Sequence, residues 1–340
     1  MRNDHILEAI GGEITRRAAE REGLTQFDSQ HLSNIVWAYA KSEMRNEQVL
    51  EAIGGEITRR AGERGALTQF DFQHLSNIAW AYAKSEMRNE HFFEAIGGEI
   101  TRRAENGTLT QFNPQELSNI AWAYAKSEMS NKQVFEAISN EIARRAGEEG
   151  AFSLFAFQTL STIVWAYAAF CCGRENSEDE IKLKENLKLK SVQLLSELNL
   201  DMPGNSLVIE GWQQLAQAAA YFQLENVSTF SKNIASNTTR ESDLQKNVGK
   251  FLEGHGFRKE VQLGDHLARH QAGFYRESDQ MVIEVDGPTH FKDGQLTIET
   301  KLRNAILTRN GISLICIPFY EWDALRDDEA KKQKIRSLIG

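Results

Sequence analysis

A Gln, an Asn and a Lys recur at one spacing in the N-terminal half of the sequence. The stretch QHLSNIVWAYAKSEM begins at Gln30, and near-copies begin at Gln73, Gln115 and Gln158. In the first three copies the residues are spaced i, i+4 and i+11, roughly on one side of a helix. Amide side chains can pair with base edges in RNA, and Lys can contact phosphate. The candidate RNA-binding residues are Gln30, Asn34, Lys41, Gln73, Asn77, Lys84, Gln115, Asn119 and Lys126.

Alternatively, these residues have only a structural role and bind no RNA. In that case they form a solvated polar face, and Asn34 caps a loop or bonds the adjacent unit. Recent duplication would explain the identity of the copies, because duplication also preserves neutral residues. The fourth copy has changed to Gln158, Thr162 and Ala169.

Pairs of arginines repeat in register with these stretches. The second Arg of each pair lies four residues after a Glu, as in Glu13 and Arg17, an order that stabilises a helix by ~0.3 kcal/mol. The first Arg has no partner at that spacing, so we expect it to be the better phosphate ligand. These first arginines are Arg16, Arg59, Arg102 and Arg144.

A second group of chemically capable residues lies in the C-terminal third. Glu284 and Asp286 end the apolar run QMVIEVDG, and His290 follows shortly after. Such oxygen ligands could hold Mg²⁺ or Mn²⁺, which would activate water and stabilise a phosphoryl transition state. Lys301 and Arg303, on a following helical segment, could then contact phosphate. Alternatively, a strand ends here at a Gly-Pro turn, and the acids are solvated or paired with Lys301 or Arg303.

Two helical patterns must position the repeated residues. Leu32, Ile35, Val36 and Tyr39 follow helical periodicity, and the capping-box pattern of Asn113 and Glu116 marks a helix start. The second pattern, HILEAIGGEITRRA, has two adjacent glycines in mid-helix, which indicates close approach of a neighbouring helix. Two helices per ~43 residues predict an α-solenoid.

The repeat pattern ends after Trp165, in the fourth copy of the stretch. We expect helical-hairpin repeats over residues 1–170, closing helices over 171–225, a linker over 226–240 and an α/β domain over 241–340. The predicted order in the last domain is a helix, three strands, a helix, a strand and a helix. Trp322 is expected to anchor packing in this domain. The predicted fold class is mainly α, a solenoid followed by a small α/β domain.

Composition limits the partners. The net charge is −9 and no region is basic, so any RNA site must be a local stripe. Membrane insertion is not expected, since no apolar run approaches ~18 residues. DNA is not an expected partner either. The three Cys fit reduced thiols. The N-terminus shows no presequence and opens inside a repeat, as a fragment would.

The C-terminal motifs resemble a known domain. MVIEVDGPTHF followed by TKLRNAILTRNGISLICIPFYEWDAL resembles the RAP domain over residues 241–340, and the QxLSNIxWAYAK units resemble octotricopeptide-type and FAST-kinase-like helical repeats. The resemblance implies an RNA-binding factor of mitochondria or plastids, acting in transcript processing, stability or translation, with other RNA-processing proteins as further partners. The repeats would contact single-stranded RNA, and the RAP domain would contact an RNA end or a structured element.

The RAP domain is in turn similar to the PD-(D/E)XK nuclease fold, especially very-short-patch repair endonucleases. This implies a restriction-endonuclease-like core and a candidate metal-dependent endoribonuclease. The sequence departs from the nuclease pattern, because Gly273 stands where those enzymes carry an Asp and Asp286 replaces the Lys of E-x-K. RNA binding without a cofactor is therefore the preferred function, and a protein-interaction scaffold is a third alternative.

Overall fold

The computed structural model describes residues 4–20, 23–63, 67–146, 156–172, 177–196, 206–234 and 241–340. The chain divides into two compact units. The first consists of residues 1–170 and 176–199, and the second of residues 171–175 and 200–340. Within the described ranges, no helix combines the length and the apolar content that crossing a bilayer requires.

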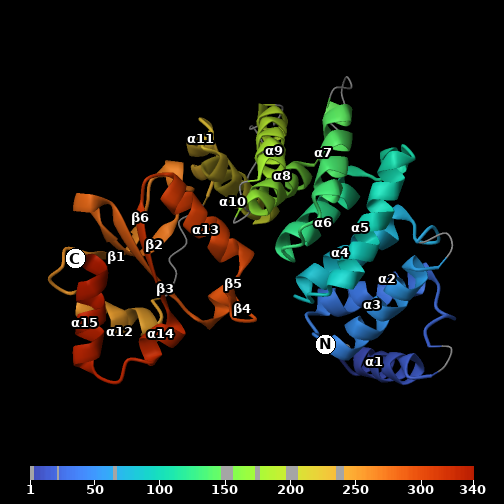
Figure 1. Ribbon diagram of the computed structural model, residues 1–340, viewed down its shortest axis with the longest axis horizontal. Coiled ribbons are helices and arrows are strands. Elements are labelled where there is room, and N and C mark those ends of the chain that lie inside the picture. The colour runs from blue at the N-terminus through green and yellow to red at the C-terminus, as the bar shows by residue number, and fades with distance from the viewer. Residues whose placement is uncertain are drawn as a thin grey trace. The chain divides into compact units, whose positions relative to one another are not determined.

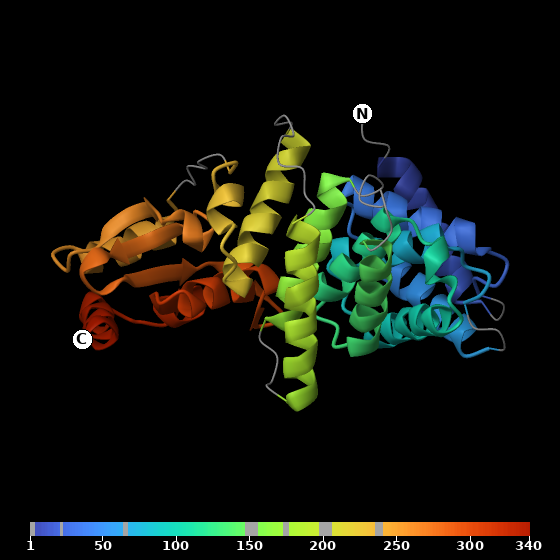
Figure 2. The same ribbon diagram turned by 90° about the horizontal axis from the view of Figure 1, so that it is seen from above.

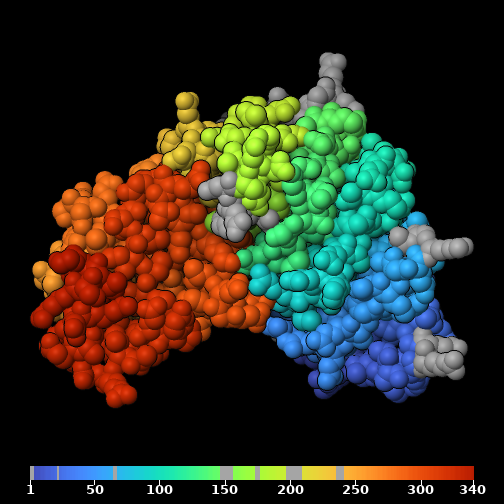
Figure 3. Space-filling view, in the orientation of Figure 1, coloured from blue at the N-terminus to red at the C-terminus, as the bar shows by residue number. Residues whose placement is uncertain are grey.

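The first unit is built from helical hairpins, as the repeat pattern predicts (Figure 1, Figure 2). Its helices are α1 (Asp4–Ala18), α2 (Ser29–Ser42), α3 (Glu47–Ala61), α4 (Phe72–Lys84), α5 (Glu90–Glu105), α6 (Pro114–Lys126), α7 (Lys132–Ala146), α8 (Phe157–Cys171) and α9 (Glu178–Ser196), with the 3-10 turn η1 (Thr108–Gln111). Helices α2, α4 and α6 pack against one another, and α1, α3, α5 and α7 form a second row, here called the Arg row. Figure 3 shows successive repeats side by side on the surface, in the order blue to green.

The predicted helix start at Asn113 is confirmed, and α2 has a similar cap. Asp28 caps α2 by accepting from the backbone N–H of His31 at 2.8 Å. Asn113 caps α6 by accepting from the N–H of Glu116 at 2.9 Å, and the Glu116 carboxylate accepts from the N–H of Asn113 at 2.8 Å. These caps satisfy helix N–H groups that have no partner within the helix.

The mid-helix glycines admit a tyrosine from the neighbouring helix. The Tyr82 hydroxyl donates to the carbonyl oxygen of Leu50 at 2.5 Å, and Tyr124 donates to Phe93 at 2.6 Å. A Cβ atom on Gly54 would lie 2.9 Å from the Tyr82 hydroxyl oxygen, too close for ordinary contact. The predicted close approach is therefore confirmed at the first glycine of each pair, whereas Gly55 faces open space.

The second unit contains a mixed sheet flanked by helices. Its main elements are α10 (Ser206–Phe222), α11 (Val227–Ser231), α12 (Asp243–Leu252), β1 (Arg258–Gln262), β2 (Gln271–Arg276), β3 (Met281–Asp286), α13 (Ile298–Arg309), β6 (Ser313–Pro318), α14 (Phe319–Asp323) and α15 (Asp328–Ile339). The sheet order is β1-β2-β3-β6, antiparallel except for the parallel pair β3 and β6. A short hairpin of β4 (Phe291–Lys292) and β5 (Gln295–Leu296) is added to the predicted element order.

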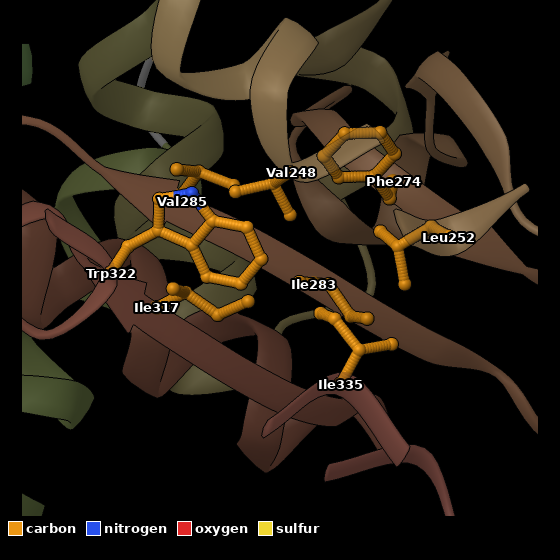
Figure 4. Close-up of a cluster of buried hydrophobic side chains, with 8 residues drawn as sticks. All are labelled: Val248, Leu252, Phe274, Ile283, Val285, Ile317, Trp322 and Ile335. Atoms are coloured by element: carbon orange, nitrogen blue, oxygen red, sulfur yellow. The ribbon is translucent and has the colours of Figure 1, made fainter. Parts of the chain in front are cut away.

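The core of this α/β region lies between the sheet and helices α12, α14 and α15 (Figure 4). Trp322 is 1% exposed there, and its indole N–H donates to the Asn247 side-chain oxygen at 2.9 Å. The prediction that Trp322 anchors packing is confirmed. The fold class is confirmed as well, with helical repeats followed by a small α/β region.

The segment expected to be a linker contains a helix. Val227 and Phe230 are buried on α11, three residues apart, and the hydroxyl of Ser231 donates to the carbonyl oxygen of Asp265 at 2.8 Å. Apolar burial explains this ordering. Residues 235–240 of the expected linker lie outside the described residues.

Helix α10 belongs to the second unit rather than closing the repeats. The Arg309 guanidinium donates to the carbonyl oxygen of Tyr221 at 3.1 Å, and Asn310 donates to that of Ala220 at the same distance. An alanine-rich, buried face lets α10 pack on α13.

Candidate nucleic-acid interface and acidic cluster

The predicted RNA-binding residues of the repeats lie on the outer surface of α2, α4 and α6, here called the Trp face. Gln30, Gln73 and Gln115 are exposed. Asn34 is exposed, and Asn77 and Asn119 are half-buried. Lys41 and Lys84 are exposed, and Lys126 is half-buried. Since the three helices pack side by side, equivalent residues succeed one another across the repeats.

The asparagines of the Trp face are available to a ligand. Within the described ranges, the side-chain amides of Asn34, Asn77 and Asn119 make no hydrogen bond. The structural interpretation, in which this Asn caps a loop or bonds the adjacent unit, therefore finds no such contact. An amide carries both a donor and an acceptor, as pairing with a base edge requires.

Acidic residues are nearly absent from the helices of the Trp face. Helices α2 and α4 contain no Asp or Glu, and α6 contains only Glu116, which is engaged in its own cap. The repeated acids lie instead on the Arg row, as in Glu51 and Glu56 of α3. Most of the repeated acids thus lie on other helices than the lysines of the Trp face. These lysines form a local basic stripe, as binding of a polyanion requires.

Sequence reasoning gave the tryptophans of these helices no ligand role. Trp37 is 43% exposed, and Trp80 and Trp122 are half-buried. The Trp80 and Trp122 rings lie 6.5 Å apart at 30°, and the Lys41 ammonium lies 5.7 Å and 5.1 Å from the Trp37 and Trp80 rings. The sequence feature that could have indicated a ligand role is a large aromatic residue on a helix face that is otherwise polar.

The prediction that the first Arg of each pair lacks a partner is wrong. Its guanidinium bonds the Glu three residues earlier, as Arg59 does with Glu56 at 2.8 Å and Arg102 with Glu99 at 2.8 Å. The same pairing holds for Arg16 and Arg144. The hydrogen bond to Glu56 raises the pKa of Arg59. A phosphate would have to compete with these carboxylates, so contact by these arginines stays a prediction.

The second Arg of each pair links adjacent repeats. Arg103 is 7% exposed, bonds Glu99 at 2.6 Å and donates to the carbonyl oxygen of Phe70 at 2.5 Å. Arg60 and Arg145 make equivalent bonds to the preceding repeat. These side chains hold the solenoid together rather than meeting a ligand.

In the second unit, Glu284 and Asp286 end β3 and are buried. The Arg303 guanidinium lies 2.8 Å from Asp286 Oδ1 and 3.9 Å from Glu284 Oε2. His270 Nε2 lies 2.9 Å from Glu284 Oε1. Pairing of these acids with Arg303 is what the structural alternative predicted.

These contacts shift the pKa values of Glu284 and His290. Burial raises the pKa of Glu284, but the hydrogen bond with His270 and the charge of Arg303 outweigh it, and its pKa lies below the ordinary value. Burial and the charge of Arg303 lower the pKa of His290, opposed by Asp286 and Glu284. His290 Nδ1 lies 3.3 Å from Asp286 Oδ1.

The arrangement does not fit a divalent metal. Among the described residues, no three His, Cys, Asp or Glu side chains converge as ligands, and Arg303 already neutralises Asp286. Gly273 packs against β3, where an added Cβ would lie 3.3 Å from the Ile283 carbonyl oxygen. Lys301 is half-buried on α13. We therefore derive no metal-dependent step, and metal binding by Glu284 and Asp286 stays a prediction.

A cavity of about 330 Å³ lies beside this cluster. His290 and Arg303 line it together with residues that sequence reasoning missed, including Gln213 and Gln217 of α10 and His270. No local pattern could have joined them, because α10 lies far from β2 and α13 in the sequence.

Comparison with known families identifies both parts of the chain. Residues 283–338 match the RAP domain, so the chain is a helical-repeat protein with a C-terminal RAP domain. Residues 3–176 match the family described as RNA-editing substrate-binding complex 6 protein, and the chain belongs to this family. No curated protein matches the chain. The RAP resemblance is confirmed over residues 283–338 of the predicted 241–340, whereas the octotricopeptide, FAST-kinase and restriction-endonuclease resemblances stay predictions.

Proposed function

We propose that the chain binds single-stranded RNA along the Trp face and acts in RNA processing within a protein–RNA assembly. The observation that carries this is the succession of lysines and of asparagines on helices almost free of acids, where the asparagine amides make no hydrogen bond within the described residues. Amides meet base edges and lysines meet phosphates. The name of the matching family, which refers to a substrate-binding complex of RNA editing, supports both the ligand and the assembly.

The RAP domain is proposed to contact an RNA end or a structured element of the same transcript. The cavity of about 330 Å³ that its residues His290 and Arg303 help to line offers amides, histidines and the guanidinium groups of Arg269 and Arg303, which can bond nucleotides. By resemblance, the site of action is a mitochondrion or a plastid. Neither contact calls for a cofactor.

The alternatives have weaker support. A nuclease would need Glu284 and Asp286 to release Arg303 before they could bind Mg²⁺ or Mn²⁺. A protein scaffold is compatible with the acidic Arg row, since solenoids bind proteins as readily as RNA. The scaffold alternative does not account for an acid-poor face with unpartnered amides.

The proposal is tested by RNA binding of the double variant Asn77→Ala/Asn119→Ala. Each Ala should weaken binding by ~1–3 kcal/mol if its amide contacts a base. Gln48→Ala, an exposed amide on α3 of the Arg row, is the matched control and should bind RNA like the unmodified chain. Unchanged affinity in the double variant would refute the role of the amides.

A further inference from the structure

The exposed or half-buried tryptophans of the Trp face call for an explanation that packing does not supply. Trp165 occupies the equivalent position in α8 and is only 4% exposed, so this sequence position is compatible with burial. Trp37, by contrast, is 43% exposed, and Trp80 and Trp122 are half-buried. Three large aromatic side chains are therefore presented at equivalent positions of adjacent helices.

These side chains form a continuous row. The Lys41 ammonium lies over the rings of Trp37 and Trp80, at 5.7 Å and 5.1 Å, which joins the first two repeats. The rings of Trp80 and Trp122 lie 6.5 Å apart, which joins the second and third. Cation–π and ring contacts of this kind fix the orientation of the indoles.

We propose that Trp37, Trp80 and Trp122 are stacking platforms for the unpaired bases of single-stranded RNA. This inference rests on the proposed RNA-binding function and defines what the Trp face recognises. Every base has a π face, so stacking tolerates any sequence. Paired bases are inaccessible to it, because in a duplex they are already stacked inside the helix.

The order of residues along each helix fits this ligand. Asn34 precedes Trp37 by three residues, and Lys41 follows Trp37 by four, so each neighbour lies one turn away on the same side. A base stacked on the indole would place its edge toward the amide and its phosphate toward the ammonium. The same order recurs on α4 and α6.

Direct binding measurements test the inference. The ligands are a labelled oligouridine, an abasic oligoribonucleotide of equal length and an RNA duplex, each titrated at constant salt. We expect the oligouridine to bind at least about tenfold more tightly than the abasic strand or the duplex, and to quench tryptophan emission. Equal affinity for the oligouridine and the abasic strand would overturn the inference.

Variants separate stacking from structure. Trp80→Leu should weaken oligouridine binding about tenfold without changing binding of the abasic strand, and Trp80→Phe should retain most of the affinity. Trp37→Leu, at the more exposed position, gives a second variant whose fold is less affected. Ile6→Ala is the matched control, because Ile6 is an exposed apolar residue of the Arg row, 57% exposed.

The outcomes distinguish the two proposals. Unchanged oligouridine affinity in folded Trp37→Leu and Trp80→Leu would overturn stacking and leave RNA binding by amides and lysines in place. Absence of any RNA binding by the unmodified chain would overturn both. Circular dichroism and the unfolding midpoint establish that each variant is folded.

Discussion

The Arg103 guanidinium on α5 donates a 2.5 Å hydrogen bond to the carbonyl oxygen of Phe70, in the loop before α4, while holding Glu99 at 2.6 Å. The bond joins one repeat to the preceding one through groups that are almost fully buried. Neighbouring repeats supply most of the stability of a solenoid. The two arginines of this pair thus have different roles: the first, Arg102, pairs with a Glu of its own helix, and the second also bonds the preceding repeat.

Arg103→Ala should lower the free energy of unfolding by about 2–3 kcal/mol. The substitution leaves Glu99, which is fully buried, with only the partly exposed Arg102 as partner, and it leaves the Phe70 carbonyl unsatisfied. Arg102→Ala is the matched control and should cost less than about 1 kcal/mol, because Arg102 is 41% exposed. Urea unfolding measures both, and equal losses would contradict the assignment.

The glycine pairs provide a comparison within one helix. Gly54→Ala should destabilise the chain by about 1–3 kcal/mol, because its methyl group would meet the Tyr82 hydroxyl oxygen at 2.9 Å. Gly55→Ala meets nothing within 4 Å and should stabilise α3 by about 0.5–1 kcal/mol. Thermal unfolding of the two single variants is the measurement. If both variants changed the stability in the same direction, the contact with Tyr82 would not be the reason that position 54 requires glycine.

The pH dependence of stability should reveal the acidic cluster. Because the pKa of Glu284 in the folded chain lies below its ordinary value, its ionised form stabilises the fold near neutral pH. This contribution is lost as the pH falls through the folded-state pKa. Glu284→Gln should therefore be less stable than the unmodified chain near neutral pH, and the difference should shrink as the pH falls through the folded-state pKa of Glu284.

The control for that experiment is Glu277→Gln, whose side chain is 76% exposed. Its stability relative to the unmodified chain should vary little with pH. A deficit of Glu284→Gln that grows on acidification would contradict the predicted sign.

RNA affinity should depend on salt as lysine–phosphate contacts require. With ~4 such contacts, log K should fall against log[salt] with a slope of about −3. The double variant Lys41→Gln/Lys84→Gln should reduce the magnitude of that slope by about 1.4. Lys250→Gln, an exposed lysine on α12, should leave the slope unchanged. A slope near zero in the unmodified chain would exclude the proposed phosphate contacts.

The nuclease alternative has its own measurement. Because Arg303 occupies the carboxylates of β3, we expect labelled RNA to stay intact with Mg²⁺ or Mn²⁺. Metal-dependent cleavage that is abolished by Glu284→Ala would establish the nuclease. It would contradict our interpretation that Glu284 and Asp286 pair with Arg303 and bind no metal. Cleavage that survives in Glu284→Ala/Asp286→Ala would exclude these residues from catalysis.

Features encoded by local patterns were predictable from the sequence. The capping box of Asn113 and Glu116 and the strand ending at Asp286 depend on residues close in the chain, and both are confirmed. The partner of Arg102 was missed because the i,i+4 spacing was considered and the i,i+3 contact with Glu99 was not. The helix at Val227 was missed because the segment is mostly polar and has only two buried apolar residues, Val227 and Phe230, to indicate packing.

Tertiary contacts set the remaining features. Gln213 lines the same cavity as His290 and Arg303 because α10 packs on α13, which no sequence spacing indicates. Likewise, the glycine pair signals a close approach, but the partner, Tyr82, lies on another helix. Trp37 is exposed and Trp165 is buried at the same motif position, so the sequence could not show which tryptophans are exposed.

The central claim, that RNA lies along the Trp face, is tested most directly by ultraviolet crosslinking of bound oligouridine followed by mass spectrometry of the crosslinked peptides. The account predicts crosslinks in α2, α4 and α6, at or beside Trp37, Trp80 and Trp122. Crosslinks confined to the Arg row helices α1, α3 and α5, with the Trp face unmodified, would contradict it.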